Sequence, residues 1–309
     1  MPSTFEGMAQ PRHASPMPYV WPDKKRCALV ISIDVDEETP MLWRTRNNNV
    51  RNVAELEMRR FGLRVGMPRI LELLAHHQVR ASFFVPGAVA ASNPGLLPTL
   101  LSHGHEIGLH GYFHEPVAEL SPNENAMVLD RTTRVFKEQT GRVPRGYRSP
   151  CWQYTEEMPG LLMAHGIEYD SSMMGYDHPY TFEGLSEIPV SWSTDDAVSM
   201  LFIGDGSDMS PPWPARNVMD HWFDEWQATL SSGGLAMITL HPWVCGTATR
   251  MAMLDNLLRR ILKSDGENST GVWCTTAQDV ATYHRTSVNF ERFAVSSDVP
   301  NAPRYAFNF

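Results

Sequence analysis

Two histidines separated by three residues follow a short apolar segment in the first half of the chain. They are His110 and His114, in the sequence EIGLHGYFHEP of residues 106–116. Side chains four residues apart on one helical turn point the same way, so this pair has the spacing of a metal site. Taken alone, a chance surface pair is the simpler interpretation, because the chain contains 12 histidines. A metal site therefore requires a carboxylate partner.

A carboxylate partner is offered by SIDVDEE, residues 32–38, at the end of the first predicted strand. Asp34 and Asp36 lie two residues apart, so in an extended chain they share one face. The alternative is a solvated acidic loop, because two glutamates follow directly. One carboxylate and two imidazoles form a three-ligand set that leaves a position for water. Zn²⁺ suits these ligands best, although other divalent metals are compatible with them.

Three later segments also place a polar side chain at the end of a predicted strand. They are RGYRSPCW with Arg148, IEYDSS with Asp170, and LHPW with His241. Each has a simpler explanation, as a surface charge, a helix cap or a buried histidine. Catalytic groups of parallel α/β barrels lie at the carboxyl ends of the strands, so the five clusters together favour an active site. The motifs HExxH, GxSxG and GxGxxG are absent.

The elements that would position these residues alternate along the chain. Short apolar segments predict strands at 28–33, 81–85, 106–109, 167–169, 187–192, 235–240 and 271–274. Helical spacing predicts helices at 67–76, 94–102, 121–141, 156–165, 217–231 and 251–263, the third with a capping box at Ser121 and a stop at Gly141. This alternation implies parallel βαβ units, and about seven units fit the length, which favours a barrel over an open sheet.

The predicted organisation is a single barrel domain at 25–284 with an extended arm before it, 1–24, and a tail after it, 285–309. The aromatic tail is expected to pack on the barrel or on a neighbouring subunit. Two excursions, 39–62 and 203–216, interrupt the alternation and are expected to be functional loops. They contain Trp43, Met209 and Trp213, which suit a small enclosed pocket. Packing against another subunit is an equally good interpretation of both.

Composition limits the classes of function. The chain has 309 residues, of which 42% are hydrophobic and 20% charged, with a net charge of −9. This acidic balance argues against a nucleic-acid binder and against attachment to an anionic membrane. The four cysteines form no CxxC pair, so neither a disulfide framework nor a cysteine zinc site is indicated. No signal-peptide pattern or spanning apolar segment is present, and we expect a cytoplasmic protein.

The ordered set SIDVDEE, HGYFH, RGYRSPCW, DSS and LHP resembles the polysaccharide deacetylase superfamily (NodB homology, carbohydrate esterase family 4) over roughly residues 27 to 245. RASFFVPG and GHEIGLH are also typical of it. The resemblance implies a distorted (β/α)7 barrel and a divalent metal, with Asp36, His110 and His114 as its ligands. It further implies that Asp34 is the general base and that Arg148 orients it. His241 would be the general acid, and Asp170 would tune this histidine.

The first motif departs from the family pattern, in which the two aspartates are adjacent. Here Val35 separates them, so the base and ligand roles of Asp34 and Asp36 are open to exchange. The D-x-D form is similar to one branch of the family. That branch includes peptidoglycan-deacetylase-like proteins, cyclic imide hydrolases and an allantoinase that works without metal, and it suggests a homo-oligomer, a tetramer or dimer.

The predicted function is metal-dependent hydrolysis of a carbon–nitrogen bond in a small amide, cyclic imide or ureide. The first alternative is deacetylation of N-acetylated sugars or peptidoglycan. A non-catalytic ligand-binding barrel is the alternative from another class. A glycosidase that uses the aspartate pair is a weaker interpretation, because the two carboxyl groups are too close and the histidines would have no role.

Overall fold

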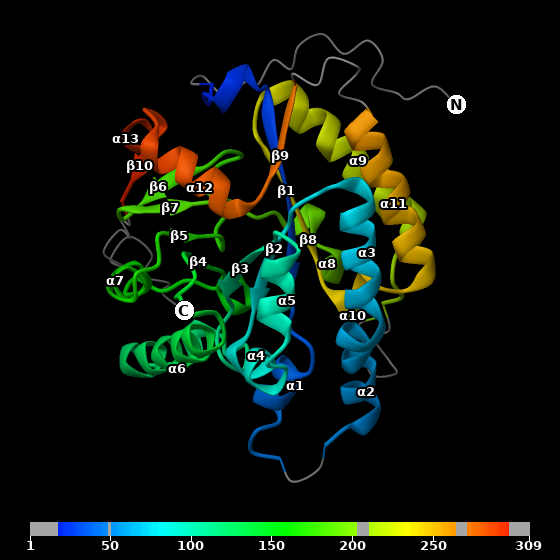
Figure 1. Ribbon diagram of the computed structural model, residues 1–309, viewed down its shortest axis with the longest axis vertical. Helices are drawn as coiled ribbons and strands as arrows, with labels where there is room; N and C mark the ends of the chain where they lie inside the picture. The colour runs from blue at the N-terminus through cyan, green and yellow to red at the C-terminus, as the bar shows by residue number, and fades with distance from the viewer. Residues whose placement is uncertain (1–17, 49–50, 203–209, 264–270, 297–309) are drawn as a thin grey trace, which may run out of the picture.

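A single sheet of ten strands carries the candidate residues (Figure 1). The computed structural model describes residues 18–48, 51–202, 210–263 and 271–296. The strands are β1 (Cys27–Asp34), β2 (Ser82–Val85), β3 (Glu106–Leu109), β4 (Gly146–Tyr147), β5 (Tyr169–Asp170), β6 (Tyr180–Phe182), β7 (Leu185–Glu187), β8 (Leu235–Leu240), β9 (Val272–Thr275) and β10 (Ala294–Val295).

The strand order is β10-β6-β7-β5-β4-β3-β2-β1-β8, and β9 also pairs with β1. All pairings are parallel except that of β6 with β7. An isolated parallel bridge between Asp195 and Thr239 joins the segment after β7 to β8, so this segment closes onto the β8 edge of the sheet. The predicted fold, a distorted single-domain α/β barrel, is confirmed.

The continuous apolar character of β1 follows from burial on both of its faces. Leu29, Ile31 and Ile33 pack in one core cluster, whereas Ala28 and Val30 pack in a second cluster on the opposite face. Because side chains alternate along a strand, Ser32 and Asp34 lie on the same face as Ala28 and Val30. The alternation therefore directs the first candidate carboxylate toward the interior of the barrel.

The helices surround this sheet, and Figure 1 shows α3, α9 and α11 together beside β1 and β8. They are α1 (Thr39–Arg44), α2 (Val53–Phe61), α3 (Met67–His77), α4 (Gly87–Ser92), α5 (Leu96–Ser102), α6 (Pro122–Thr140), α7 (Met158–Ala164), α8 (Asp196–Met200), α9 (Ala215–Ser232), α10 (Pro242–Cys245), α11 (Ala248–Lys263), α12 (Ala277–Thr286) and α13 (Asn289–Arg292). Single turns are η1 (Pro22–Lys24), the π-type η2 (Gly62–Gly66), η3 (Val117–Glu119), η4 (Pro150–Trp152) and η5 (Trp192–Thr194). None of the described helices is long and apolar enough to cross a membrane.

The first excursion, expected as a loop at 39–62, contains two helices, α1 and α2. The π-type turn η2 then continues α2 into α3. Its two glycines permit close packing at the strand ends. A Cβ on Gly62 would lie 2.1 Å from Glu37 Oε1, and a Cβ on Gly66 would lie 2.0 Å from the Pro242 carbonyl oxygen. In the second excursion, Trp213 is exposed, and Met209 lies outside the described residues.

Both ends of the described chain pack on the barrel. Tyr19 and Trp21, from the predicted arm, are buried, and Trp21 Nε1 donates to the Gly233 carbonyl at 2.7 Å. In the predicted tail, α13 leads to β10, which pairs with β6, and Phe293 is buried beside Tyr19. The tail therefore covers its own barrel as far as residue 296.

Candidate functional site

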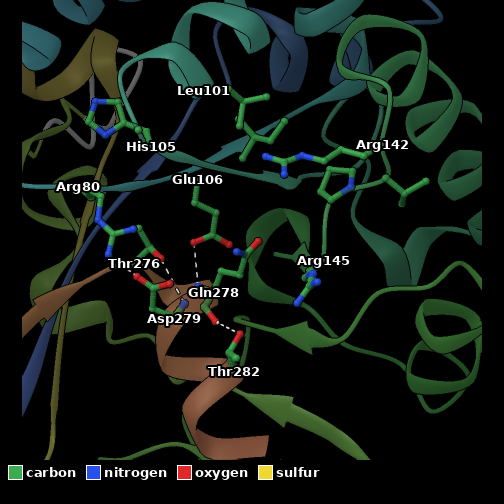
Figure 2. Close-up of a pocket in the computed structure, with 14 residues that line it drawn as sticks. Arg80, Leu101, His105, Glu106, Arg142, Arg145, Thr276, Gln278, Asp279 and Thr282 are labelled. Atoms are coloured by element: carbon green, nitrogen blue, oxygen red, sulfur yellow. Dashed lines mark hydrogen bonds and ion pairs between the residues drawn. The ribbon is translucent and has the colours of Figure 1, made fainter. Parts of the chain in front are cut away.

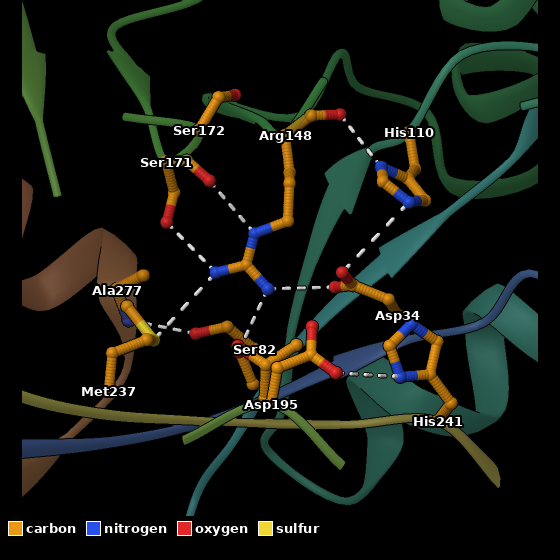
Figure 3. Close-up of polar contacts among 12 residues, drawn as sticks. Asp34, Ser82, His110, Arg148, Ser171, Ser172, Asp195, Met237, His241 and Ala277 are labelled. Atoms are coloured by element: carbon orange, nitrogen blue, oxygen red, sulfur yellow. Dashed lines mark hydrogen bonds and ion pairs between the residues drawn. The ribbon is translucent and has the colours of Figure 1, made fainter. Parts of the chain in front are cut away.

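The candidate side chains converge at the carboxyl ends of the strands. Asp34 ends β1 and Asp36 follows it, His110 follows β3, Arg148 follows β4, and His241 follows β8. Figure 3 shows Asp34 beside the guanidinium of Arg148, with His110 and His241 farther out on the same side. Ile33 of β1 pairs with Leu240 of β8, so the next residues on these adjacent strands are Asp34 and His241.

Asp36 lies between the two histidines that the sequence paired. His110 Nε2 is 3.2 Å from Asp36 Oδ1, and His114 Nε2 is 3.5 Å from Asp36 Oδ2. The three side chains are buried, and one ligand atom from each lies within 4.8 Å of the others. The expected helical turn is absent, because residues 110–116 are not helical in the structure. Instead, Gly111 and His114 adopt positive φ angles of 66° and 59°, and this turn brings the rings together.

These three residues fit a divalent metal ion. Asp36 Oδ1 is buried and has no hydrogen-bond partner among the described residues. His110 Nδ1 lies 2.8 Å from the Arg148 carbonyl oxygen, which can only accept, so Nδ1 carries the proton. In the neutral ring, Nε2 then presents its lone pair toward the Asp36 carboxylate, a donor arrangement that a divalent cation held by these residues would stabilise. Burial would raise the pKa of Asp36, but the facing histidines hold it well below its usual range.

Arg148 is held in a fully buried socket beside Asp34 (Figure 3). Its Nη1 donates at 2.8 Å both to Asp34 Oδ1 and to Ser32 Oγ. Its Nε and Nη2 donate at 2.9 Å to the carbonyl oxygen and to Oγ of Ser171. The ring of Phe84 lies under the guanidinium, 4.2 Å from the Cζ atom. These contacts fix one oxygen of Asp34 and leave Oδ2 directed toward His110, 4.0 Å from its Nε2.

His241 is oriented by Asp196, the first residue of α8. His241 Nδ1 is 2.7 Å from Asp196 Oδ1, and the backbone N–H of His241 donates to Asp196 Oδ2 at 2.9 Å. Its Nε2 faces the proposed metal ligands, 3.6 Å from Asp36 Oδ2. Burial lowers the pKa of His241, but the carboxylates of Asp196 and Asp195 outweigh burial and raise it well above its usual value.

The expected pairing of Asp170 with His241 is therefore corrected. Asp170 Oδ1 accepts a hydrogen bond from Ser172 Oγ at 2.8 Å, and the carboxyl group faces Glu187. Both acids are buried, and burial raises the pKa of each. The nearby Asp170 raises the pKa of Glu187 further, whereas the hydrogen bond with Glu187 lowers that of Asp170, so the proton of the pair stays on Glu187. Asp170 therefore belongs to a buried polar network with Ser172 and Glu187. The carboxylate beside His241 is that of Asp196.

Asp196 and Ser171 are the contacts that sequence reasoning did not assign. Ser171 belongs to the quoted motif DSS, and Asp196 ends the segment EIPVSWSTDD. Asp195 caps α8, since its Oδ1 accepts from the Ala197 N–H at 2.7 Å. Two adjacent aspartates at a helix start were therefore the available signal: one caps the helix, and the other is free to turn back toward the barrel.

A family model and two curated relatives indicate a polysaccharide deacetylase. The model of the family "Polysaccharide deacetylase" matches residues 61–169. A peptidoglycan deacetylase of Helicobacter pylori is 24% identical over 268 residues, which cover 77% of this chain and 92% of that protein. A peptidoglycan-N-acetylglucosamine deacetylase of Listeria monocytogenes is 35% identical over 135 residues, or 43% of this chain and 28% of that protein.

Solved structures are similar over most of the chain. A Mycobacterium smegmatis protein assigned as a polysaccharide deacetylase superposes with a TM-score of 0.77 and 32% identity, covering 86% of this chain and 92% of that chain. The Puue allantoinase has a TM-score of 0.76 and 20% identity, covering 92% of this chain and 100% of that chain. At this lower identity the allantoinase bears on the fold alone.

Proposed function

Because the chain belongs to the polysaccharide deacetylase family, we propose that it hydrolyses a small amide, cyclic imide or ureide with the help of a divalent metal ion. The family consists of hydrolases of carbon–nitrogen bonds other than peptide bonds, and the chain is a hydrolase of this class. The finer assignment of substrate, metal and residue roles is our proposal. It rests on the geometry around Asp36.

The metal ligands in this proposal are Asp36, His110 and His114, and zinc suits this donor set best. A bound divalent ion supplies Lewis acidity, which lowers the pKa of water and polarises the substrate carbonyl. Asp34 Oδ2 accepts the proton of the water that adds to the carbonyl carbon, while Arg148 holds Oδ1. This division assigns the base role to Asp34 and the ligand role to Asp36.

His241 supplies the proton that the leaving nitrogen needs. Asp196 engages its Nδ1, so the proton at Nε2 is directed toward Asp36 and the reaction centre. When the carbon–nitrogen bond breaks, transfer of this proton avoids an amide anion, which is a poor leaving group. The observation that carries the proposal is that Asp34 and His241 follow paired residues of β1 and β8, and that each faces the set of Asp36, His110 and His114.

The small opening of the site favours a small substrate. Asp36, His114 and His241 are only 6%, 8% and 7% exposed. The helix α10 directly follows His241 and contacts α2 and η2, so the insertion after β1 packs at the strand ends that hold the site. A long glycan needs an open groove, whereas a ring-sized amide or imide needs less space.

Deacetylation of an N-acetylated sugar or of peptidoglycan is the second candidate. It is favoured by the names of the Helicobacter and Listeria relatives, both of which are peptidoglycan deacetylases. The chemistry is the same, since an acetamide is also cleaved at its carbon–nitrogen bond. The two candidates differ in what the opening admits.

One screen separates these candidates. The zinc-loaded protein is incubated with succinimide, hydantoin and allantoin, and in parallel with N-acetylglucosamine oligomers. We expect ring opening of at least one cyclic substrate and little release of acetate. Acetate release without any ring opening would reverse the order of the two candidates.

Elemental analysis tests the ligand assignment separately. We expect one equivalent of metal in the native protein and loss of metal and activity in Asp36→Ala and His114→Ala. His221→Ala is the matched control, because this histidine is on α9 and about half of its side chain is exposed. Full metal content and full rate in the Asp36 variant would refute the assignment.

Cytoplasmic location and a homo-oligomeric state, dimer or tetramer, are further proposals. Light scattering coupled to size-exclusion chromatography gives the mass in solution directly. A mass near 34.9 kDa, that of one chain, would contradict the oligomer.

A further inference from the structure

A cavity of about 750 Å³ lies at the other end of the sheet from Asp36 (Figure 2). Among its lining residues, Arg80 precedes β2, Glu106 is the first residue of β3, Arg145 directly precedes β4, and Thr276 is the N-cap of α12. The amino ends of parallel strands share one edge of a sheet, so the cavity is separate from the candidate metal site at the carboxyl ends. Its volume lies within the range of about 300–1,000 Å³ that is usual for small-molecule sites.

Three arginines line the cavity, and two of them have donors to spare. Arg80 is paired, with Nη2 2.5 Å from Asp279 Oδ2. Arg145 Nη1 is 3.6 Å from Glu168 Oε2, but Arg285 lies nearer to the same oxygen, at 3.0 Å. The ion pair of Arg145 is therefore loose and exposed, and such pairs contribute little.

Arg142 is the least engaged of the three arginines. Within the described ranges its guanidinium forms no ion pair or hydrogen bond, and Figure 2 shows it directed toward the cavity. Arg142 and Arg145 are separated by two residues in the connection from α6 to β4, and both side chains reach the same space. A chain of net charge −9 thus places two weakly paired cations together on one side of a cavity.

The buried acid of the cavity is already engaged by the protein. Glu106 Oε2 accepts from Ser82 Oγ at 2.6 Å and from the Gln278 N–H at 2.9 Å, and its Oε1 accepts from the hydroxyl of Tyr169. Burial raises the pKa of Glu106, although these hydrogen bonds oppose the rise. The Glu106 carboxylate therefore accepts hydrogen bonds from the fold, including one from the first turn of α12. It does not form an ion pair with Arg142 or Arg145.

We propose that this cavity binds a phosphate group, as inorganic phosphate or as a phosphate monoester, between Arg142 and Arg145. A guanidinium presents paired N–H donors that match the oxygens of a phosphate, and two guanidiniums balance a phosphate dianion. Arg80, across the cavity in Figure 2, is balanced by its ion pair with Asp279, so the free positive charge lies on the side of Arg142 and Arg145. The cavity also leaves room for an organic group attached to the phosphate.

Isothermal titration calorimetry with inorganic phosphate and with glycerol phosphate, in a chloride buffer at pH 7.5, tests the site. The native protein is expected to bind at least one of these probes saturably. Arg142→Gln and Arg145→Gln should each weaken binding about ten-fold or more, because each removes charge-assisted hydrogen bonds. Arg142→Lys should retain part of the affinity, since it keeps the charge but not the paired donors.

Two controls define the location of the phosphate. Arg216→Gln, which removes an exposed arginine on α9 outside the cavity, should bind like the native protein. His114→Ala should also bind like the native protein, because the site does not use the candidate metal ligands. Loss of binding in His114→Ala would place the phosphate at the metal site and overturn the proposal. Absence of saturable binding at millimolar phosphate, or equal losses in the Arg142 and Arg216 variants, would overturn it as well.

Discussion

The buried ion pair between Arg148 and Asp34 allows a quantitative test of the candidate site. The two side chains are 0% and 2% exposed, and their closest nitrogen and oxygen atoms are 2.8 Å apart. Arg148→Met keeps much of the side-chain volume but leaves the Asp34 carboxylate buried without its counter-charge. We expect this variant to lose about 3–5 kcal/mol of unfolding free energy, the usual cost of removing one partner from a buried pair.

A double-mutant cycle isolates the pair from the lost packing. Asp34→Asn removes the charge, so Arg148→Met combined with Asp34→Asn no longer leaves a bare carboxylate. The double variant should therefore be more stable than the sum of the single effects predicts, by about 1.5–3 kcal/mol. The free energies come from urea unfolding followed by tryptophan fluorescence, with EDTA present so that metal binding does not contribute.

An exposed ion pair provides the matched control cycle. Arg260 Nη1 and Asp220 Oδ1 are 2.7 Å apart, but their side chains are 38% and 59% exposed. Arg260→Met combined with Asp220→Asn should show a coupling below about 1 kcal/mol, because solvent screens this pair. If the buried cycle gave no larger coupling than the exposed one, the inference that the ion pair with Arg148 fixes the Asp34 carboxylate would be wrong.

Four other substitutions have defined outcomes. Asp196→Asn should move the basic limb of the pH–rate profile toward lower pH, because losing the carboxylate lowers the pKa of His241 and the acid deprotonates earlier; an unmoved limb would exclude His241 as the acid. Gly66→Ala should destabilise the protein in thermal unfolding, since its Cβ would lie 2.0 Å from a backbone carbonyl. Gly160→Ala in α7, with nothing within 4 Å, should be neutral or stabilising. Phe293→Ala should cost about 3–5 kcal/mol in urea unfolding, and an unchanged stability would show that the tail does not contribute to the core.

Elements with a local signal could be predicted from the sequence. The apolar run at 28–33 predicted the strand that the structure gives as Cys27–Asp34. The capping box at Ser121 and the stop at Gly141 predicted the helix Pro122–Thr140, and both caps are present. These signals lie within a few residues of what they determine, so tertiary contacts did not need to be known.

Features that depend on distant partners could not be predicted in the same way. The segment 39–62 was expected to be a loop, whereas it is largely helical, and Gly62 and Gly66 allow the chain after α2 to approach Glu37 and Pro242. Likewise, the partner of His241 is Asp196, 45 residues earlier. Only the approach of the segment after β7 to β8 brings the two together.

The pairing of β1 with β8 has a consequence for how such an enzyme changes its substrate. Because Ile33 is aligned with Leu240, the proposed proton acceptor, Asp34, and the proposed proton donor, His241, are the next residues along two neighbouring chain segments. The distance between their backbones is then set by the interstrand spacing of about 4.8 Å. A slip of one residue would turn one of them away from the other. New substrate specificity is therefore expected to arise in the insertions around the opening. The strand pairing meanwhile fixes the backbone positions of Asp34 and His241.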